Sequence, residues 1–71
     1  MSINNLTIIL NGRKEKISKI NTLSELITLK KLDPKKIVTE INLQIIDRDK
    51  LHTTKINEND TIEIISFVGG G

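Results

Sequence analysis

The dipeptide Asn11-Gly12 constrains the fold of this chain more than any other feature of its sequence. Both residues tolerate positive φ, so together they favour the type I′ turn of a two-residue β-hairpin. The preceding segment, Ile3–Leu10, alternates between two faces in the way that is typical of a half-buried strand. A second strand, from about Arg13 to Ser18, is therefore expected to run back antiparallel to the first.

A capping-box motif indicates where a helix begins. In Thr22-Leu23-Ser24-Glu25, the Thr22 hydroxyl suits the N-cap, and Glu25 occupies the third helical position, from which its side chain can reach back. The apolar residues that follow recur at helical spacing. Because Pro34 disfavours helical geometry at the residue before it, the helix is expected to end near Lys31 or Leu32. The segment predicts an amphipathic helix of about ten residues that packs on the sheet.

Three further strands are expected after the helix. Alternation predicts them at Ile37–Ile41, Gln44–Ile46 and Thr61–Val68, with an irregular connection or a single 3₁₀ turn over 47–55. The 14 Ile residues support a sheet, because β-branched side chains favour strands. One helix must then cover one face of the sheet. The chain is therefore predicted to be a single α+β domain.

The composition argues against several classes of function. The net charge of +2 is too small to indicate a polyanionic partner, and the basic runs Lys30-Lys31 and Lys35-Lys36 lack aromatic neighbours that could stack on bases. With no Cys and a single His, the chain has no thiol nucleophile and no thiolate metal ligand. No apolar run reaches the roughly 18 residues of a membrane span, and no secretory signal begins the sequence. We expect no catalytic residue, no metal site, no nucleic-acid or membrane partner, and a cytoplasmic location.

The last three residues, Gly69-Gly70-Gly71, have the most specific functional meaning. Three glycines without Cβ atoms form the thinnest segment that a chain can make, and such a segment can enter a narrow channel and present its carboxylate to a reactive centre. The alternative is a frayed end, since termini are commonly disordered. Three of the four glycines lie here, directly after a predicted strand, which favours the first interpretation. We divide the chain into one domain, residues 1–68, and a flexible glycine tail, residues 69–71.

An apolar docking surface is predicted beside this tail. If Ile62 and Ile64 face the helix, alternation places Ile65 and Phe67 on the open face of the sheet, where Ile9 is expected to join them from a neighbouring strand. An exposed apolar cluster suggests a protein contact, although scattered surface hydrophobes are ordinary. The predicted docking residues are Ile9, Ile65, Phe67, Val68 and Arg48.

Arg48 differs from the rest of this set because two acidic residues flank it. It stands between Asp47 and Asp49, so its guanidinium is expected in local ion pairs, with a partner contact as the alternative.

Short motifs along most of the chain resemble the ThiS family of sulfur carriers, which has the ubiquitin-like β-grasp fold. The matching motifs are Leu10-Asn11-Gly12, Thr22-Leu23-x-Glu25-Leu26, Leu32-Asp33-Pro34-Lys35, Glu40-Ile41-Asn42, Ile45-Ile46-x-Arg48, Asp60-x-Ile62-Glu63-Ile64 and Phe67-Val68-Gly69-Gly70-Gly71. The resemblance implies a β-grasp roll: a mixed sheet of four to five strands with one helix packed across one face. Leu43 departs from the Asn-Gly turn that is common in the family, and a different turn is expected there.

The resemblance also implies a role as a protein co-substrate that catalyses nothing itself and binds no cofactor. A ThiF-like adenylating enzyme would use ATP and Mg to activate the carboxylate of Gly71. Sulfur from a cysteine desulfurase route would then displace AMP and leave a thiocarboxylate. A ThiG-like thiazole synthase would receive this sulfur for thiamin biosynthesis, while Gly69 and Gly70 let the tail enter both active sites.

Other functions remain open on the residues alone. A MoaD-like carrier for molybdopterin synthesis uses the same fold and the same tail chemistry, and a protein modifier conjugated to lysines would be activated in the same way. A non-catalytic interaction module with an incidental glycine end, or a weakly basic RNA-contacting β-grasp domain, belongs to a different class. Loss of Gly70-Gly71 would abolish a carrier and leave an interaction module or an RNA-contacting domain intact.

Overall fold

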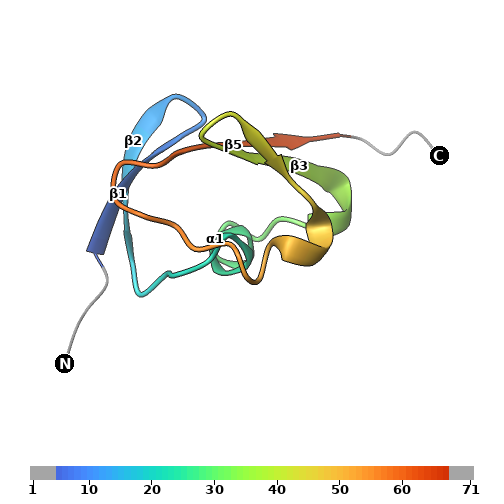
Figure 1. Cartoon of the computed structure of the whole chain (residues 1–71), viewed down its shortest axis with the longest axis horizontal. Helices are drawn as coiled ribbons and strands as arrows, with labels where there is room; N and C mark the ends of the chain where they lie inside the picture. Colours follow the sequence, from blue (N-terminus) through green and yellow to red (C-terminus); the bar gives the residue numbers. More distant parts are fainter. Residues whose placement is uncertain (1–4, 68–71) are drawn as a thin grey trace.

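A computed structural model describes residues 5–67, which form one mixed sheet with a helix beneath it (Figure 1). The spatial order of the strands is β2-β1-β5-β3-β4, so the last strand lies at the centre of the sheet. The pairing of β1 with β5 is parallel, and the other three pairings are antiparallel. The strands are β1 (Asn5–Leu10), β2 (Arg13–Ser18), β3 (Ile37–Ile41), β4 (Gln44–Ile46) and β5 (Thr61–Ser66). The predicted α+β architecture and element order are confirmed.

Both hairpins turn through residues with positive φ. In the first hairpin, Asn11 has φ 51° and Gly12 has φ 83°, as the type I′ turn requires. In the second, Asn42 has φ 50° and Leu43 has φ 70°. The prediction of a different turn at Leu43 is therefore wrong, because the leucine itself adopts the left-handed conformation that normally favours glycine or asparagine.

The helix begins where predicted and ends earlier. Helix α1 spans Leu23–Leu29, and its capping box is complete at Thr22 and Glu25. The chain leaves the helix through Lys30 and then Lys31, whose φ of 59° cannot continue a right-handed helix. Pro34 opens a separate 3₁₀ helix, η1 (Pro34–Lys36), that the sequence did not predict; a second, η2 (Arg48–Lys50), occupies the connection where a 3₁₀ turn was expected.

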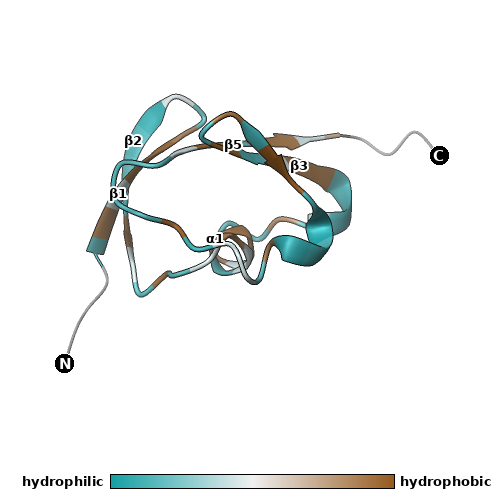
Figure 2. Ribbon diagram, viewed as in Figure 1, coloured by the Kyte–Doolittle hydropathy of each residue, from teal (hydrophilic) through white to brown (hydrophobic). Residues whose placement is uncertain are grey.

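The core lies between α1 and one face of the sheet. Strand alternation sends Ile8, Ile62 and Ile64 toward the helix, which contributes Leu23, Leu26 and Ile27. Figure 2 shows the matching division: β2 and η2 are mostly hydrophilic, whereas β1 and β3 carry hydrophobic stretches. The buried hydrophobic residues are Ile8, Ile17, Ile20, Leu23, Leu26, Ile27, Ile37, Ile41, Leu51, Ile56, Ile62 and Ile64. The other face of the sheet is left without a covering layer among residues 5–67.

Within the described residues, no helix combines the length and the apolarity that crossing a membrane would require.

Candidate functional site

The candidate site is the face of the sheet that points away from α1. On β5, Ile62 and Ile64 are buried in the core, whereas Ile65 is 56% exposed on the opposite side. Phe67 follows the strand and is 46% exposed, and its backbone amide donates to the Lys36 carbonyl at 2.9 Å. The placement predicted for Ile65 and Phe67 is therefore observed. The strand itself ends at Ser66, two residues earlier than expected.

Two further apolar residues widen this surface. Val38 pairs with Ile65 across β3 and β5, and Ile45 extends the surface onto β4, where it is 68% exposed. We call this surface the open face and define its exposed apolar residues as Val38, Ile45, Ile65 and Phe67. Sequence reasoning missed Val38 and Ile45, although the inward alternation of Ile37, Thr39 and Ile41 carried the signal for Val38.

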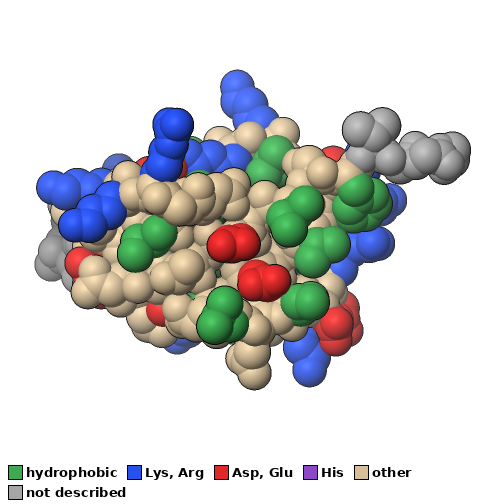
Figure 3. Space-filling model, turned by 90° about the horizontal axis from the view of Figure 1, so that it is seen from above, with side chains coloured by type: hydrophobic (Ala, Val, Ile, Leu, Met, Phe, Trp, Pro, Cys, Tyr) green, Lys and Arg blue, Asp and Glu red, His purple; other side chains and the backbone are tan. Residues whose placement is uncertain are grey.

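Two carboxylates occupy the middle of the open face. Glu40 on β3 and Glu63 on β5 are direct partners in the antiparallel register, and both alternate away from the core. Figure 3 looks onto this face and shows two acidic side chains side by side, with hydrophobic side chains around them and lysines or arginines toward the rim. The site therefore combines an apolar ring with a negative centre.

Ile9 and Arg48 contribute less than was predicted. Ile9 points to the open face but is half-buried, and its partner on β5 is Thr61, so it lies apart from Ile65 at the other end of that strand. In the part of the chain that the structure describes, no ion pair joins Arg48 to either neighbouring aspartate. That expectation is wrong: Asp47 lies before η2 in an extended conformation, and Arg48 and Asp49 are consecutive residues of a helical turn, which do not face each other.

Arg48 instead lies at the rim of the sheet. Its side chain borders a shallow hollow beside β4, to which Val38 and Ile45 also contribute. It is thus a neighbour of the open face rather than part of its centre.

The predicted tail residues fall outside the described residues. These are Val68 and Gly69, Gly70 and Gly71. Phe67 precedes them directly, so the chain passes from the open face into the tail.

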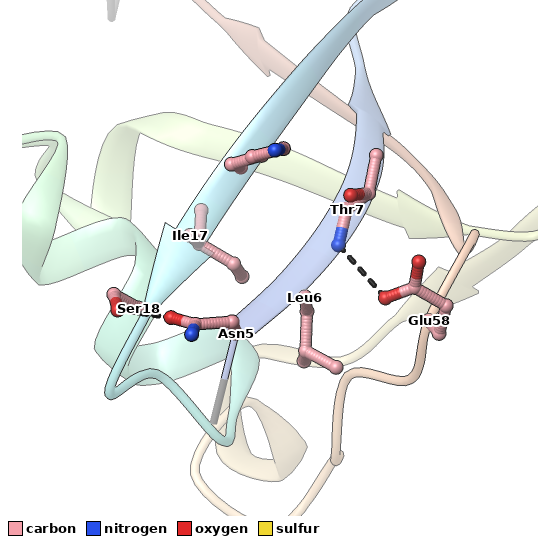
Figure 4. Close-up of a pocket in the computed structure, with 7 residues that line it drawn as sticks. Asn5, Leu6, Thr7, Ile17, Ser18 and Glu58 are labelled. Carbon is pink, nitrogen blue, oxygen red and sulfur yellow. Dashed lines mark hydrogen bonds between the residues drawn. The ribbon is translucent and has the colours of Figure 1, made fainter. Parts of the chain in front are cut away.

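A hollow at the far end of the sheet offers little to a ligand. It lies between β1, β2 and the segment around Glu58, and Figure 4 shows the Glu58 carboxylate directed at the backbone amide of Thr7. That amide donates to Glu58 at 2.9 Å, and the Ser18 hydroxyl donates to the side chain of Asn5. These polar groups are already paired within the chain. Residues 5–67 also contain no cluster of three or more His, Asp or Glu side chains that could hold a metal ion.

Comparisons with known proteins agree on one family. Residues 2–71 match the family model described as the ThiS family. Sulfur carrier protein ThiS of Bacillus subtilis is 36% identical over 63 residues, covering 87% of this chain and 96% of that protein. A thiazole synthase of Paramagnetospirillum magneticum is 29% identical over 66 residues, covering 93% of this chain. The chain spans only 20% of the length of that relative.

A solved structure has the same fold. The crystal structure of a thiamine biosynthesis protein (ThiS) from Geobacter metallireducens superposes with a TM-score of 0.79 at 22% identity. The match covers 93% of this chain and 100% of that one. The mixed sheet with a single helix is therefore the ubiquitin-like β-grasp fold.

Proposed function

The chain belongs to the ThiS family of sulfur carriers in thiamin biosynthesis, and on that premise we propose that it carries sulfur as a thiocarboxylate on Gly71 for thiazole formation. The observation that carries the proposal is the extent of the family match, which runs from residue 2 to residue 71 and so includes the glycine tail. A resemblance confined to the body of the domain would have supported the fold without the tail chemistry.

The chemistry follows from the poor reactivity of a free carboxylate. In the proposed reaction, the carboxylate of Gly71 attacks the α-phosphate of ATP on a ThiF-like adenylating enzyme, pyrophosphate leaves, and an acyl-adenylate forms. The enzyme supplies the Mg that neutralises the phosphates. A cysteine desulfurase route delivers sulfur as a persulfide, and a thiol reductant releases it as hydrosulfide with formation of a disulfide. The hydrosulfide then attacks the carbonyl carbon and displaces AMP. The product carries one sulfur in place of one oxygen.

In this proposal the chain is a protein co-substrate rather than an enzyme. The carried sulfur resides on the C-terminal carbonyl, so no side chain needs to hold it, which suits a chain without cysteine. Three glycines suit a segment that must enter two different active sites, because they add no side-chain bulk. Because the adenylating enzyme uses ATP, we propose that this reaction takes place in the cytoplasm.

The open face is the proposed docking surface for both partners. It exposes four apolar side chains, and the residue that precedes the tail, Phe67, is one of them. Docking there would set the tail at a fixed starting point relative to a partner's active site. A segment similar to this chain occupies a fifth of a protein named thiazole synthase, which supports a ThiG-like enzyme as the sulfur acceptor.

Intact-mass spectrometry tests the proposal directly. The protein would be incubated with a ThiF-type adenylating enzyme, Mg·ATP, cysteine, a cysteine desulfurase and a thiol reductant. We expect a mass gain equal to the replacement of one oxygen by one sulfur, and we expect a variant lacking Gly70-Gly71 to show none. Transfer to thiazole synthase rather than to a molybdopterin synthase would then separate the thiazole role from the MoaD-like alternative.

The proposal would be overturned by an unmodified C-terminus under conditions in which the same enzymes modify a known ThiS protein. An interaction module with an incidental glycine end would then be the better description.

A further inference from the structure

We propose that Glu40 and Glu63 form the recognition centre of the open face, and that the partner surface that covers it places an arginine or lysine side chain against these two carboxylates. The inference rests on the proposed function, because it specifies the chemistry of the protein that docks on this carrier. The partner surface complementary to the open face would have a positively charged centre within a ring of apolar side chains.

The position of the two carboxylates is unfavourable within the isolated chain. Glu40 and Glu63 are direct cross-strand partners, and side chains so placed have Cβ atoms about 4.5–5.5 Å apart. Like charges directly opposite each other destabilise a sheet. Within residues 5–67, the ion pair that is present joins Lys30 to Glu15, so no Lys or Arg of the described chain forms an ion pair with Glu40 or Glu63.

The surroundings of the pair make a cation in the partner necessary. Ile45 pairs with Glu40 on the β4 side, and Val38 pairs with Ile65 next along the strands. A partner that covers these apolar side chains would remove water from the carboxylates between them. Burying two uncompensated charges is costly, and an arginine can satisfy both carboxylates because its guanidinium has five donors in a fixed plane.

The same charges argue against other occupants of the open face. A symmetric contact with a second copy would bring four carboxylates together around the two-fold axis. An anionic membrane surface or a nucleic acid would place phosphates against them. A heterologous protein surface with a positive centre is the occupant that the charges favour.

The test compares single neutral replacements with a matched control. Glu40→Gln and Glu63→Gln each raise the net charge from +2 to +3. Asp49→Asn does the same from η2, away from the centre of the open face. Binding of each protein to the ThiF-type adenylating enzyme would be measured by calorimetry at several salt concentrations. We expect each Glu→Gln variant to bind on the order of tenfold more weakly, with a shallower dependence on salt, and Asp49→Asn to match the wild type.

Thermal unfolding separates a binding effect from a folding effect. Because each Glu→Gln change removes a like-charge pair, we expect the Tm to rise by about 1–5 °C while binding weakens. A drop in Tm would mean that the carboxylates stabilise the fold and would overturn the proposal. Glu63→Lys provides a second check, since reversal of the charge should weaken binding more than neutralisation.

Each remaining outcome decides between the two proposals. If the wild type gains sulfur and both Glu→Gln variants bind as tightly as it does, the charge inference fails and the carrier function stands. If the wild type neither binds the enzyme nor gains sulfur, the proposed function fails and this inference fails with it. A concentration-dependent dimer that Glu63→Gln strengthens would show that a second copy covers the face.

Discussion

The side-chain oxygen of Asn11 accepts a hydrogen bond from the backbone amide of Ile64 at 2.9 Å. The backbone amide of Asn11 also donates to the Ile62 carbonyl at 2.9 Å. Strands β1 and β5 pair in parallel at only two positions, Ile9 with Thr61 and Leu10 with Ile62. The turn residue therefore extends this short ladder by one step, with a side chain acting in place of a backbone carbonyl.

Replacement of Asn11 is expected to weaken the central pairing of the sheet. Asn11→Gly keeps a residue that adopts positive φ easily but removes the acceptor for the Ile64 amide. We expect a loss of about 1–3 kcal/mol in the free energy of unfolding, measured by chemical denaturation. Asn11→Asp keeps an acceptor and should retain most of the stability. Equal stability of Asn11→Gly and the wild type would show that the bond to Ile64 contributes nothing.

Thr39 carries a buried hydroxyl that has no hydrogen-bond partner in the part of the chain that the structure describes. The residue is 3% exposed on the core face of β3, and its Oγ1 has no hydrogen-bond partner among residues 5–67. Thr39→Val replaces this hydroxyl by a methyl group of similar shape, so we expect the free energy of unfolding to rise by about 1 kcal/mol. Thr39→Ser, which keeps the hydroxyl and loses the methyl group, should be less stable than the wild type. A destabilised Thr39→Val protein would mean that the hydroxyl is satisfied in solution.

Leu43 is expected to be replaceable with a gain in stability. Its φ is 70° and its side chain is 88% exposed, so the fold bears the strain of a left-handed leucine and gains little burial from it. Glycine has no Cβ and adopts this conformation freely. We therefore expect Leu43→Gly to remove about 1 kcal/mol of backbone strain from the folded state and to raise the Tm by a few degrees. Leu43→Ala is the matched control, since it removes the exposed side chain but retains the Cβ. A gain with Ala as large as with Gly would assign the effect to exposure rather than to backbone strain.

The capping box makes part of the stability dependent on pH. The backbone amide of Asn21, followed by that of Thr22, donates to the Glu25 carboxylate and lowers its pKa below the ordinary value. A carboxylate whose pKa is lower in the folded state than in the unfolded state stabilises the fold at any pH above its unfolded pKa, which is about 4.3 for Glu. This stabilisation is lost as the pH falls through the pKa of the folded state. Unfolding free energies measured below about pH 4.3 should therefore decline more steeply for the wild type than for Glu25→Gln. If the unfolding free energies of the wild type and Glu25→Gln fell equally with pH, the Glu25 carboxylate would have the same pKa in the folded and unfolded states.

Phe67 should matter for partner binding and little for folding. The residue lies outside the buried core and is 46% exposed. Phe67→Ala is therefore expected to change the Tm by only a few degrees. The same substitution is expected to weaken binding to the adenylating enzyme about tenfold or more. Leu29→Ala is a suitable control, because Leu29 is 52% exposed on α1, which covers the other side of the sheet. A large loss of stability in Phe67→Ala would place its ring in the core. Equal weakening by both variants would remove Phe67 from the docking surface.

The candidate site could be predicted only in part. Alternation along β5 places Ile65 and Phe67 opposite Ile62 and Ile64, but both faces of this strand carry apolar residues, so the structure decided which of them is buried. The apolar neighbours Val38 and Ile45 belong to strands whose spatial order depends on long-range pairing. The docking role of all these residues, and the chemistry of Gly71, remain predictions.

Asp60 illustrates a role that sequence reasoning missed. The pattern around it indicated only a turn, but the residue is 8% exposed. Its carboxylate accepts from the backbone amide of Asn57 at 2.7 Å and from the side chain of Asn42 at 2.9 Å. Asn42 lies in the second hairpin, 18 residues earlier. A short-range pattern cannot indicate that a turn residue and an aspartate so far apart will meet beside β5.

The sequence by itself determined the local elements: the Asn11-Gly12 hairpin, the start of the helix at its capping box, and the alternation of side chains along the strands. These depend on φ preferences, on hydrogen bonds between near neighbours and on side-chain period, all of which act within a few residues. Only the tertiary structure decided that β5 enters between β1 and β3, that α1 stops at Leu29, and that Glu40 faces Glu63. These features depend on which distant segments bury their apolar faces together, because the free energy of that burial, unlike a local preference, belongs to the whole chain.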